Sequence, residues 1–312
     1  MNEILGDAVI TANQILIMFF LILVGVVLYK TKLISDEGNK SMTNIALYVA
    51  ISAVVIDSYQ MPFDKTIAIN LLWTLLLATV SHFLLILIST LLFKKKNEEY
   101  RVLRFATVFG NCSFMGIPLL SAIIPGTGVI YATAYITVFN ILLWTYGVII
   151  SDKTGEKLSL KKIILSPVIL SVFVGLVLFL FSIKLWSPLG TAVSYVGSLN
   201  TPLAMIITGV SVAKSNILSA FRKKDIYIVS FIKLILVSLI MSVIMRFMPF
   251  LSEEIKLAVI VLSGVPTAAT SIMFAGKYGN NDIYAVEILV LTTVLSLITL
   301  PLSVFLGMLI CG

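Results

Sequence analysis

Long apolar runs separated by short polar segments dominate the chain and predict ten membrane-spanning helices. The runs cover about residues 8–29, 41–57, 67–93, 104–124, 129–150, 163–183, 192–213, 226–248, 255–276 and 284–310. Each is close to the roughly 20 apolar residues that a helix needs to cross a bilayer. A transmembrane β-barrel would instead show short segments in which apolar and polar residues alternate. We therefore expect one all-α, polytopic membrane domain over residues 1–312, without a linker that divides it.

The composition strengthens this interpretation. Of the 312 residues, 59% are hydrophobic and only 12% are charged, whereas soluble domains carry about 25% charged residues. Such a chain cannot cover a surface that faces water, which excludes a soluble enzyme. The two cysteines and the single histidine, His82, provide neither a disulfide framework nor a metal site. No Walker-type phosphate loop occurs, so we expect no cofactor, no metal and no direct use of ATP.

The basic residues predict the orientation in the membrane. Of the 22, 17 lie in loops that follow the first, third, fifth, seventh and ninth runs. They are Lys30, Lys32, Lys40, Lys94, Lys95, Lys96, Arg101, Arg104, Lys153, Lys157, Lys161, Lys162, Lys214, Arg222, Lys223, Lys224 and Lys277. Cytoplasmic loops carry such an excess, so we expect a bacterial-type plasma membrane protein with both termini outside. Because the net charge of +7 is confined to short loops, it does not indicate a nucleic-acid partner.

Two Gly-x-Pro sequences interrupt apolar runs at related positions in the two halves. Gly116-Ile117-Pro118 and Gly264-Val265-Pro266 lie 148 residues apart, close to half the chain. Five runs in each half, about 8–150 and 163–310, predict an inverted repeat whose paired interruptions mark a substrate site. Proline removes a helix hydrogen bond. We therefore expect new half-helices to begin near Pro118 and Pro266, with their positive N-terminal ends facing an anion at mid-membrane. The alternative is that both prolines only kink their helices.

Four segments resemble the auxin efflux carrier family, which includes plant auxin exporters and bacterial permeases often labelled malate permeases. The main one is GNCSFMGIP at residues 110–118. It is supported by GVPTAA at 264–269, TVLSLITLP at 293–301 and NTPLA at 200–204. The resemblance covers the whole chain. It departs from the family at Ser52, where the second helix usually carries a proline.

This resemblance implies a fold related to that of bile-acid symporters. In that fold, ten helices form two inverted five-helix repeats, and broken helices 4 and 9 cross at their prolines. Helices 1, 2, 6 and 7 would form a scaffold that joins two copies into a homodimer. Helices 3–5 and 8–10 would form a transport unit that moves in an elevator-type mechanism.

Asn111 is the strongest single candidate for substrate binding, because its amide offers two donors and an acceptor to a carboxylate. Its alternative role is a polar contact between helices. The full set of substrate-binding candidates is Asn44, Asn111, Gly116, Pro118, Asn200, Gly264, Pro266, Thr267 and Thr270. The hydroxyls of Thr267, Thr270 and Ser271 either line the site or bond back to helix carbonyls.

Three of the charged or titratable residues within the apolar runs have a candidate functional role. His82 can relay a proton, because an imidazole titrates near neutral pH, but a neutral, hydrogen-bonded interior histidine is the simpler interpretation. Glu287 is either a proton-coupling acid or a partner for the helix dipole. Lys233 can attract an anion, but we expect its side chain to extend to the cytoplasmic surface.

The sequence thus favours a secondary active or facilitative transporter of a small organic carboxylate anion, surrounded by membrane lipid. A membrane sensor for the same ligand is the alternative, which the lack of an output domain within this sequence disfavours. An intramembrane enzyme is weaker still, because no acid pair or Ser/His combination lies within the runs.

Overall fold

A computed structural model describes residues 2–95, 97–152, 165–214 and 217–311, and all its regular elements are helical. Several helices continue one another through a π-helical turn, denoted η. The elements are α1 (Asn2–Lys30), α2 (Asp36–Ile45), η1 (Ala46–Ala50), α3 (Ile51–Ser58), α4 (Lys65–Leu92), α5 (Glu98–Val108), η2 (Cys112–Gly116), α6 (Ile117–Ile123), α7 (Gly128–Leu142), η3 (Leu143–Gly147), α8 (Val148–Ser151), α10 (Pro167–Leu180), α11 (Ser187–Ser198), α12 (Asn200–Lys214), α13 (Ile217–Ala220), α14 (Lys224–Phe231), η4 (Ile232–Leu236), α15 (Val237–Arg246), α16 (Glu253–Gly264), α17 (Thr270–Lys277) and α18 (Asp282–Cys311).

Each of the ten apolar runs falls on one helix or on consecutive helices, apart from residues 163–164 of the sixth run, which lie outside the described residues. Among the described residues, seven helical segments are long and apolar enough to cross a membrane. The three other runs correspond to the shorter helix α10 and to the two interrupted pairs, α5–α6 and α16–α17. The expectation of an all-helical, multi-pass membrane protein is confirmed, whereas crossing by these three runs stays a prediction.

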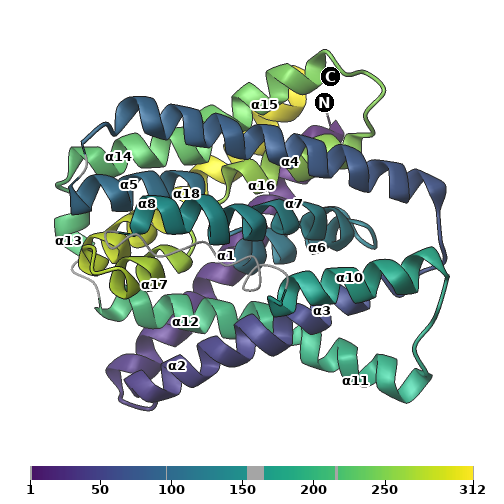
Figure 1. Ribbon diagram of the computed structural model, residues 1–312, viewed down its shortest axis with the longest axis horizontal. Coiled ribbons are helices and arrows are strands. Elements are labelled where there is room, and N and C mark those ends of the chain that lie inside the picture. The colour runs from purple at the N-terminus through teal and green to yellow at the C-terminus, as the bar shows by residue number, and fades with distance from the viewer. Residues whose placement is uncertain (1, 96, 153–164, 215–216, 312) are drawn as a thin grey trace.

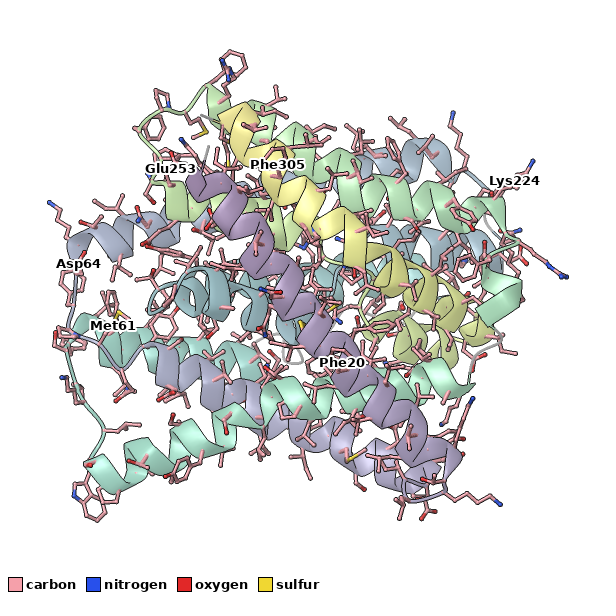
Figure 2. The ribbon with its side chains drawn as sticks, turned by 180° about the vertical axis from the view of Figure 1, so that it is seen from behind. Phe20, Met61, Asp64, Lys224, Glu253 and Phe305 are labelled. Atoms are coloured by element: carbon pink, nitrogen blue, oxygen red, sulfur yellow. The ribbon has the colours of Figure 1, made fainter. Side chains whose placement is uncertain are left out.

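The helices form two groups. In Figure 1, α2, α3, α10, α11 and α12 lie in the lower half, and α4, α5 and α14–α16 lie above them. Helix α17 lies just above α12 and packs against α18. Helix α1 runs diagonally across both groups and lies beside α18 in Figure 2. Glycines bring α1 and α12 together: a Cβ on Gly25 or Gly209 would overlap the backbone of the facing helix. Small residues allow such close packing between helices in membranes.

The outer surface is apolar between two polar ends. Phe20 on α1 is 66% exposed, as expected of a side chain that faces lipid. Asp64 and Lys224 lie near opposite ends of the molecule (Figure 2). Asp64 caps α4, and backbone hydrogen bonds from Ile67 and Thr66 hold the pKa of this exposed carboxyl below its usual value. The charged residues thus mark the two ends of the helix bundle.

The fourth run is interrupted at a place that the sequence did not predict. Helix α5 ends at Val108, and η2 begins at Cys112, so the break comprises Phe109–Asn111. Pro118 lies in the first turn of α6, which continues directly from η2. The prediction that the second half-helix begins near Pro118 is therefore wrong. In the ninth run the break between α16 and α17 does contain Pro266.

Candidate functional site

The two helix breaks lie against each other and pair through their backbones. Gly110 and Thr267 form an isolated antiparallel bridge. Asn111 N donates to Pro266 O at 2.7 Å, and Ala268 N donates to Phe109 O at 3.0 Å. Unwound backbone at membrane depth is tolerated where it is buried in protein or lines a cavity. This crossing meets that requirement, because each broken segment supplies partners for the other.

The C-terminal end of α5 is held by groups at least 125 residues away in the chain. The bonds are Thr267 Oγ1 to Ala106 O at 3.0 Å, Lys233 Nζ to Val108 O at 3.4 Å and the Ala268 bond to Phe109 O. The last carbonyls of a helix have no partner within it. Distant residues therefore stabilise the end of α5 where no proline forces the helix to stop.

A cavity of about 690 Å³ adjoins the crossing. Its wall includes residues of both breaks, of η1, of α7 and η3, and of the start of α10. Thr43, Trp144, Ser166 and Phe274 belong to the ends of elements that lead into the basic loops. The cavity thus lies between the crossing and the end of the bundle that carries most of the basic residues.

Three π-helical turns contribute to this wall: η1 through Leu47 and Tyr48, η2 through Ser113 and Phe114, and η3 through Leu143 and Trp144. A π turn adds a residue to a helix and is frequent at functional sites. After η1, the Ser52 hydroxyl donates to Tyr48 O at 3.0 Å, at the position where the family resemblance implies a proline. Local widening of three helices therefore shapes the space next to the crossing.

The described residues that line the cavity are uncharged, and several are polar. Asn111 is the last residue of the first break, and its side chain makes no hydrogen bond with the described residues. The Thr270 hydroxyl is buried and has no partner in the described part of the chain. Asn140 of α7 donates its Nδ2 to Ile136 O at 2.9 Å, which leaves its second amide hydrogen for a ligand. Ser113 adds a hydroxyl from η2.

A second cavity, of about 420 Å³, lies on the other side of the crossing. Pro118 lines it, together with Asp57 at the end of α3 and Asn200 at the start of α12. Both polar atoms of the Asn200 side chain are buried without a hydrogen-bond partner among the described residues. The structure therefore divides the sequence candidates between two cavities, with Asn111 and Thr270 in the larger and Pro118 and Asn200 in the smaller.

Five other substrate-binding candidates line neither cavity in the described structure, and one of them is Pro266 within the second break. Gly116 packs against Leu262, and Gly264 ends α16. Thr267 is fully buried and uses its hydroxyl on Ala106 O, so its role is to hold the crossing together. Asn44 is exposed, while its neighbour Thr43 lines the larger cavity.

The two candidates for proton coupling lie away from both cavities. His82 is 1% exposed and packs against the Tyr135 ring. Its Nδ1 lies 2.8 Å from Ala78 O, and because a carbonyl only accepts, Nδ1 carries the proton. Glu287 accepts hydrogen bonds from Ser219 and, at 2.5 Å, from Lys223 Nζ. The Glu287 carboxylate thus bonds to residues 219 and 223, which precede α14.

The expectation for Lys233 is wrong. Its side chain is 1% exposed and does not reach the surface, because Nζ points to Val108 O at the end of α5. Sequence reasoning also missed Asn140, Ser113 and Thr43 as cavity residues. Asn140 could have been found as the single amide within the apolar run 129–150. Lys233 points inward because it contacts Val108, which is 125 residues away in the chain, and the sequence around Lys233 does not indicate this contact.

Comparisons with known proteins agree with this architecture. A family described as membrane transport protein matches residues 10–304. This is the domain of the auxin efflux carrier family. The chain is 27% identical over 225 residues to an uncharacterized transporter, MJ1031, of Methanocaldococcus jannaschii. That alignment covers 65% of this chain and 70% of the relative.

Proposed function

This chain belongs to the auxin efflux carrier family of membrane transport proteins, and on that premise we propose that it transports a small organic carboxylate anion. Transport is secondary active or facilitative. The observation that supports the anion most directly is the larger cavity, where Asn111, Asn140 and Thr270 offer polar groups without any charged side chain among the described lining residues. Such a wall supplies hydrogen bonds but no counter-charge, so the negative charge of a carboxylate has to be stabilised by the backbone around the cavity.

The backbone around the cavity favours a negative ligand. Asn111 directly precedes η2 and α6, which form one continuous helical segment, and Thr270 is the first residue of α17. The N-terminal end of a helix carries unpaired N–H groups and about half a positive charge. Two such ends beside one cavity attract an anion. The amide hydrogens of Asn111 and Asn140 then orient its carboxylate.

We propose that the ten helical runs form two inverted five-helix repeats, about 8–150 and 163–310, related by the crossing. The breaks at 109–111 and 265–269 support this arrangement. With the basic loops in the cytoplasm, both termini lie outside and the larger cavity opens inward. The substrate then reaches the smaller cavity, with Pro118 and Asn200, when access alternates.

In the proposed elevator, helices 1, 2, 6 and 7 stay fixed and join two copies into a homodimer, while helices 3–5 and 8–10 move with the substrate. The two helix groups of Figure 1 support this division. So does the position of the larger cavity, which has Thr43 on one group and Asn111 and Thr270 on the other. His82 and Glu287 are the residues proposed to couple a proton.

Counterflow of labelled malate, succinate and indole-3-acetate into proteoliposomes tests this function. We expect the wild-type protein to exchange at least one of them. Asn111→Ala should raise its half-saturating concentration at least about tenfold, since hydrogen bonds to a charged ligand contribute about 1.5–3 kcal/mol. Asn44→Ala is the matched control, because Asn44 is exposed and lines neither cavity. If the wild-type protein carries none of the three anions, or both variants behave alike, the proposal fails.

Cysteine labelling tests the orientation separately. Cysteines that replace Thr127 and Ser187 should react with an impermeant reagent added outside intact cells, and one that replaces Asn97 should not. This expectation follows from the distribution of basic residues between the loops. Labelling of the Asn97 position from outside would reverse the assignment of inner and outer cavities.

A further inference from the structure

The least expected charged group of the bundle is Lys233. It lies in η4, a π-helical turn between α14 and α15, and only 1% of its surface is exposed. Its Nζ donates to Val108 O, the last residue of α5, at 3.4 Å. A Cβ added to Gly110 would lie 2.7 Å from both Cε and Nζ of Lys233. The ammonium therefore lies directly behind the first helix break.

This ammonium has no acidic partner in the described structure, where no carboxylate oxygen lies within 4.0 Å of it. Other lysines are paired: Lys214 with Asp36, Lys223 with Glu287 and Lys256 with Glu253. The titratable groups near enough to Lys233 for an electrostatic interaction include His82 and Cys112. Burying an uncompensated cation is costly, so its retention at the crossing calls for a role.

Helix ends supply the compensation that acids do not. Helix α5 ends at Val108 and α16 ends at Gly264, and each C-terminal end carries about half a negative charge. The ammonium lies near both ends, because the position of a Cβ on Gly110 is 2.7 Å from Lys233 Nζ and 3.0 Å from Cγ2 of Val265, the residue that follows α16. In transporters with broken helices, carbonyls and half-helix C-terminal ends of this kind bind the coupling cation.

We propose that Lys233 is a tethered cation that takes the place of a coupling metal ion at the crossing. Its ammonium balances the negative ends of α5 and α16. The positive ends of the following segments, at Cys112 and Thr270, then act on the cavity without opposition. Lys233 is thus a positioning and selectivity residue: it sets the sign of the charge that the cavity accepts and makes sodium unnecessary. This inference rests on the proposed anion transport.

The test uses counterflow in proteoliposomes of whichever of malate, succinate and indole-3-acetate the wild-type protein carries. Lys233→Met removes the charge and keeps the length of the side chain. We expect its half-saturating anion concentration to rise at least about tenfold, since a charge at a few ångströms acts strongly at low dielectric. The matched control is Lys256→Met, whose lysine is also buried, at 5% exposure, but pairs with Glu253. We expect the half-saturating anion concentration of Lys256→Met to differ from that of the wild type by less than about twofold.

Chemical rescue separates the charge of Lys233 from its volume. Lys233→Ala should lose anion affinity, and n-propylammonium, which replaces the missing atoms, should restore it. The neutral n-propanol should not. Rescue by both compounds, or by neither, would overturn the inference, because the lysine would then fill space or act through the fold alone. Lys233→Arg should keep more affinity than Lys233→Met.

The wild-type protein provides a measurement that does not depend on any variant folding. Its counterflow rate should be unchanged when N-methylglucamine replaces sodium. A requirement for sodium, or wild-type affinity in Lys233→Met, would overturn the role of Lys233 while anion transport stands. A wild-type protein that carries none of the three anions would overturn the proposed function instead.

Discussion

The two helix breaks of the crossing differ in what holds them open. In the ninth run, Pro266 lies within the break and Gly264 has room around it, since a Cβ there would meet its nearest neighbours at 3.5 Å. In the fourth run the break lacks a proline, and a Cβ on Gly110 would overlap the end of the Lys233 side chain. One break is encoded locally, and the other is imposed by residues from distant helices.

This difference has a physical basis. Proline ends a helix wherever it occurs in the interior, because it lacks an N–H and its ring clashes with the preceding turn. The chain at 109–111 has no proline, and Gly110 disfavours a helix by only about 1 kcal/mol. Helix α5 ends where Thr267, Lys233 and Ala268 bond to its last carbonyls. The locally encoded break should tolerate changes in its neighbours, whereas the imposed break should not.

The largest expected effect comes from Gly110→Ala. Its methyl group would lie 2.7 Å from Lys233 Nζ and 3.0 Å from Val265 Cγ2. Overpacking of this kind costs about 1–3 kcal/mol, and displacement of the ammonium should lower counterflow to about a tenth or less. Gly264→Ala is the matched change at the edge of the other break and should retain most activity. Equal activity of the two variants in proteoliposomes would remove the distinction between the breaks.

Pro266→Ala should reduce transport without loss of thermal stability. Alanine favours a helix interior over proline by about 3 kcal/mol, so α16 can extend and withdraw Pro266 O from the Asn111 N–H. Melting temperature and counterflow are measured on the same preparation. A parallel, modest fall in both would indicate an ordinary kink in the helix.

Two threonine variants should distinguish a residue that stabilises the crossing from a residue that binds the ligand. Thr267→Val leaves the buried Ala106 carbonyl without its partner, which costs about 1–3 kcal/mol of stability. Thr270→Val removes a hydroxyl that has no partner within the described residues, so stability should hold while anion affinity falls several-fold. Thermal unfolding and anion titration of both variants test this. A loss of stability in Thr270→Val together with a loss of anion affinity in a stable Thr267→Val would contradict it.

The smallest effect is expected from Pro118→Ala. Pro118 lies two residues after the π turn η2, where the regular pattern of helix hydrogen bonds is already interrupted, so its missing N–H costs little. Counterflow should stay within about twofold of wild type, because the break lies at 109–111. A loss as large as that of Pro266→Ala would mean that the two prolines play equivalent roles after all.

The sequence predicted the helices well, because spans of apolar residues are a local and strong signal. It also named Asn111, Thr270 and Pro266 as candidate site residues, and all three lie at or beside the crossing. It failed at Pro118 and Lys233 for one reason: the break at 109–111 is stabilised by residues at least 125 positions away. Helix-breaking residues are visible in a sequence, but the partners that satisfy a freed carbonyl are not.

The central claim is that both breaks build one anion site, with Asn111 beside the first and Thr270 beside the second. A double-mutant cycle of Asn111→Ala and Thr270→Val, read as equilibrium affinity for the transported anion, tests it most directly. We predict that each single variant binds more weakly and that the double variant loses less than the product of the two factors, since both side chains face one ligand. Wild-type affinity in either single variant, or losses that multiply fully, would contradict a shared site.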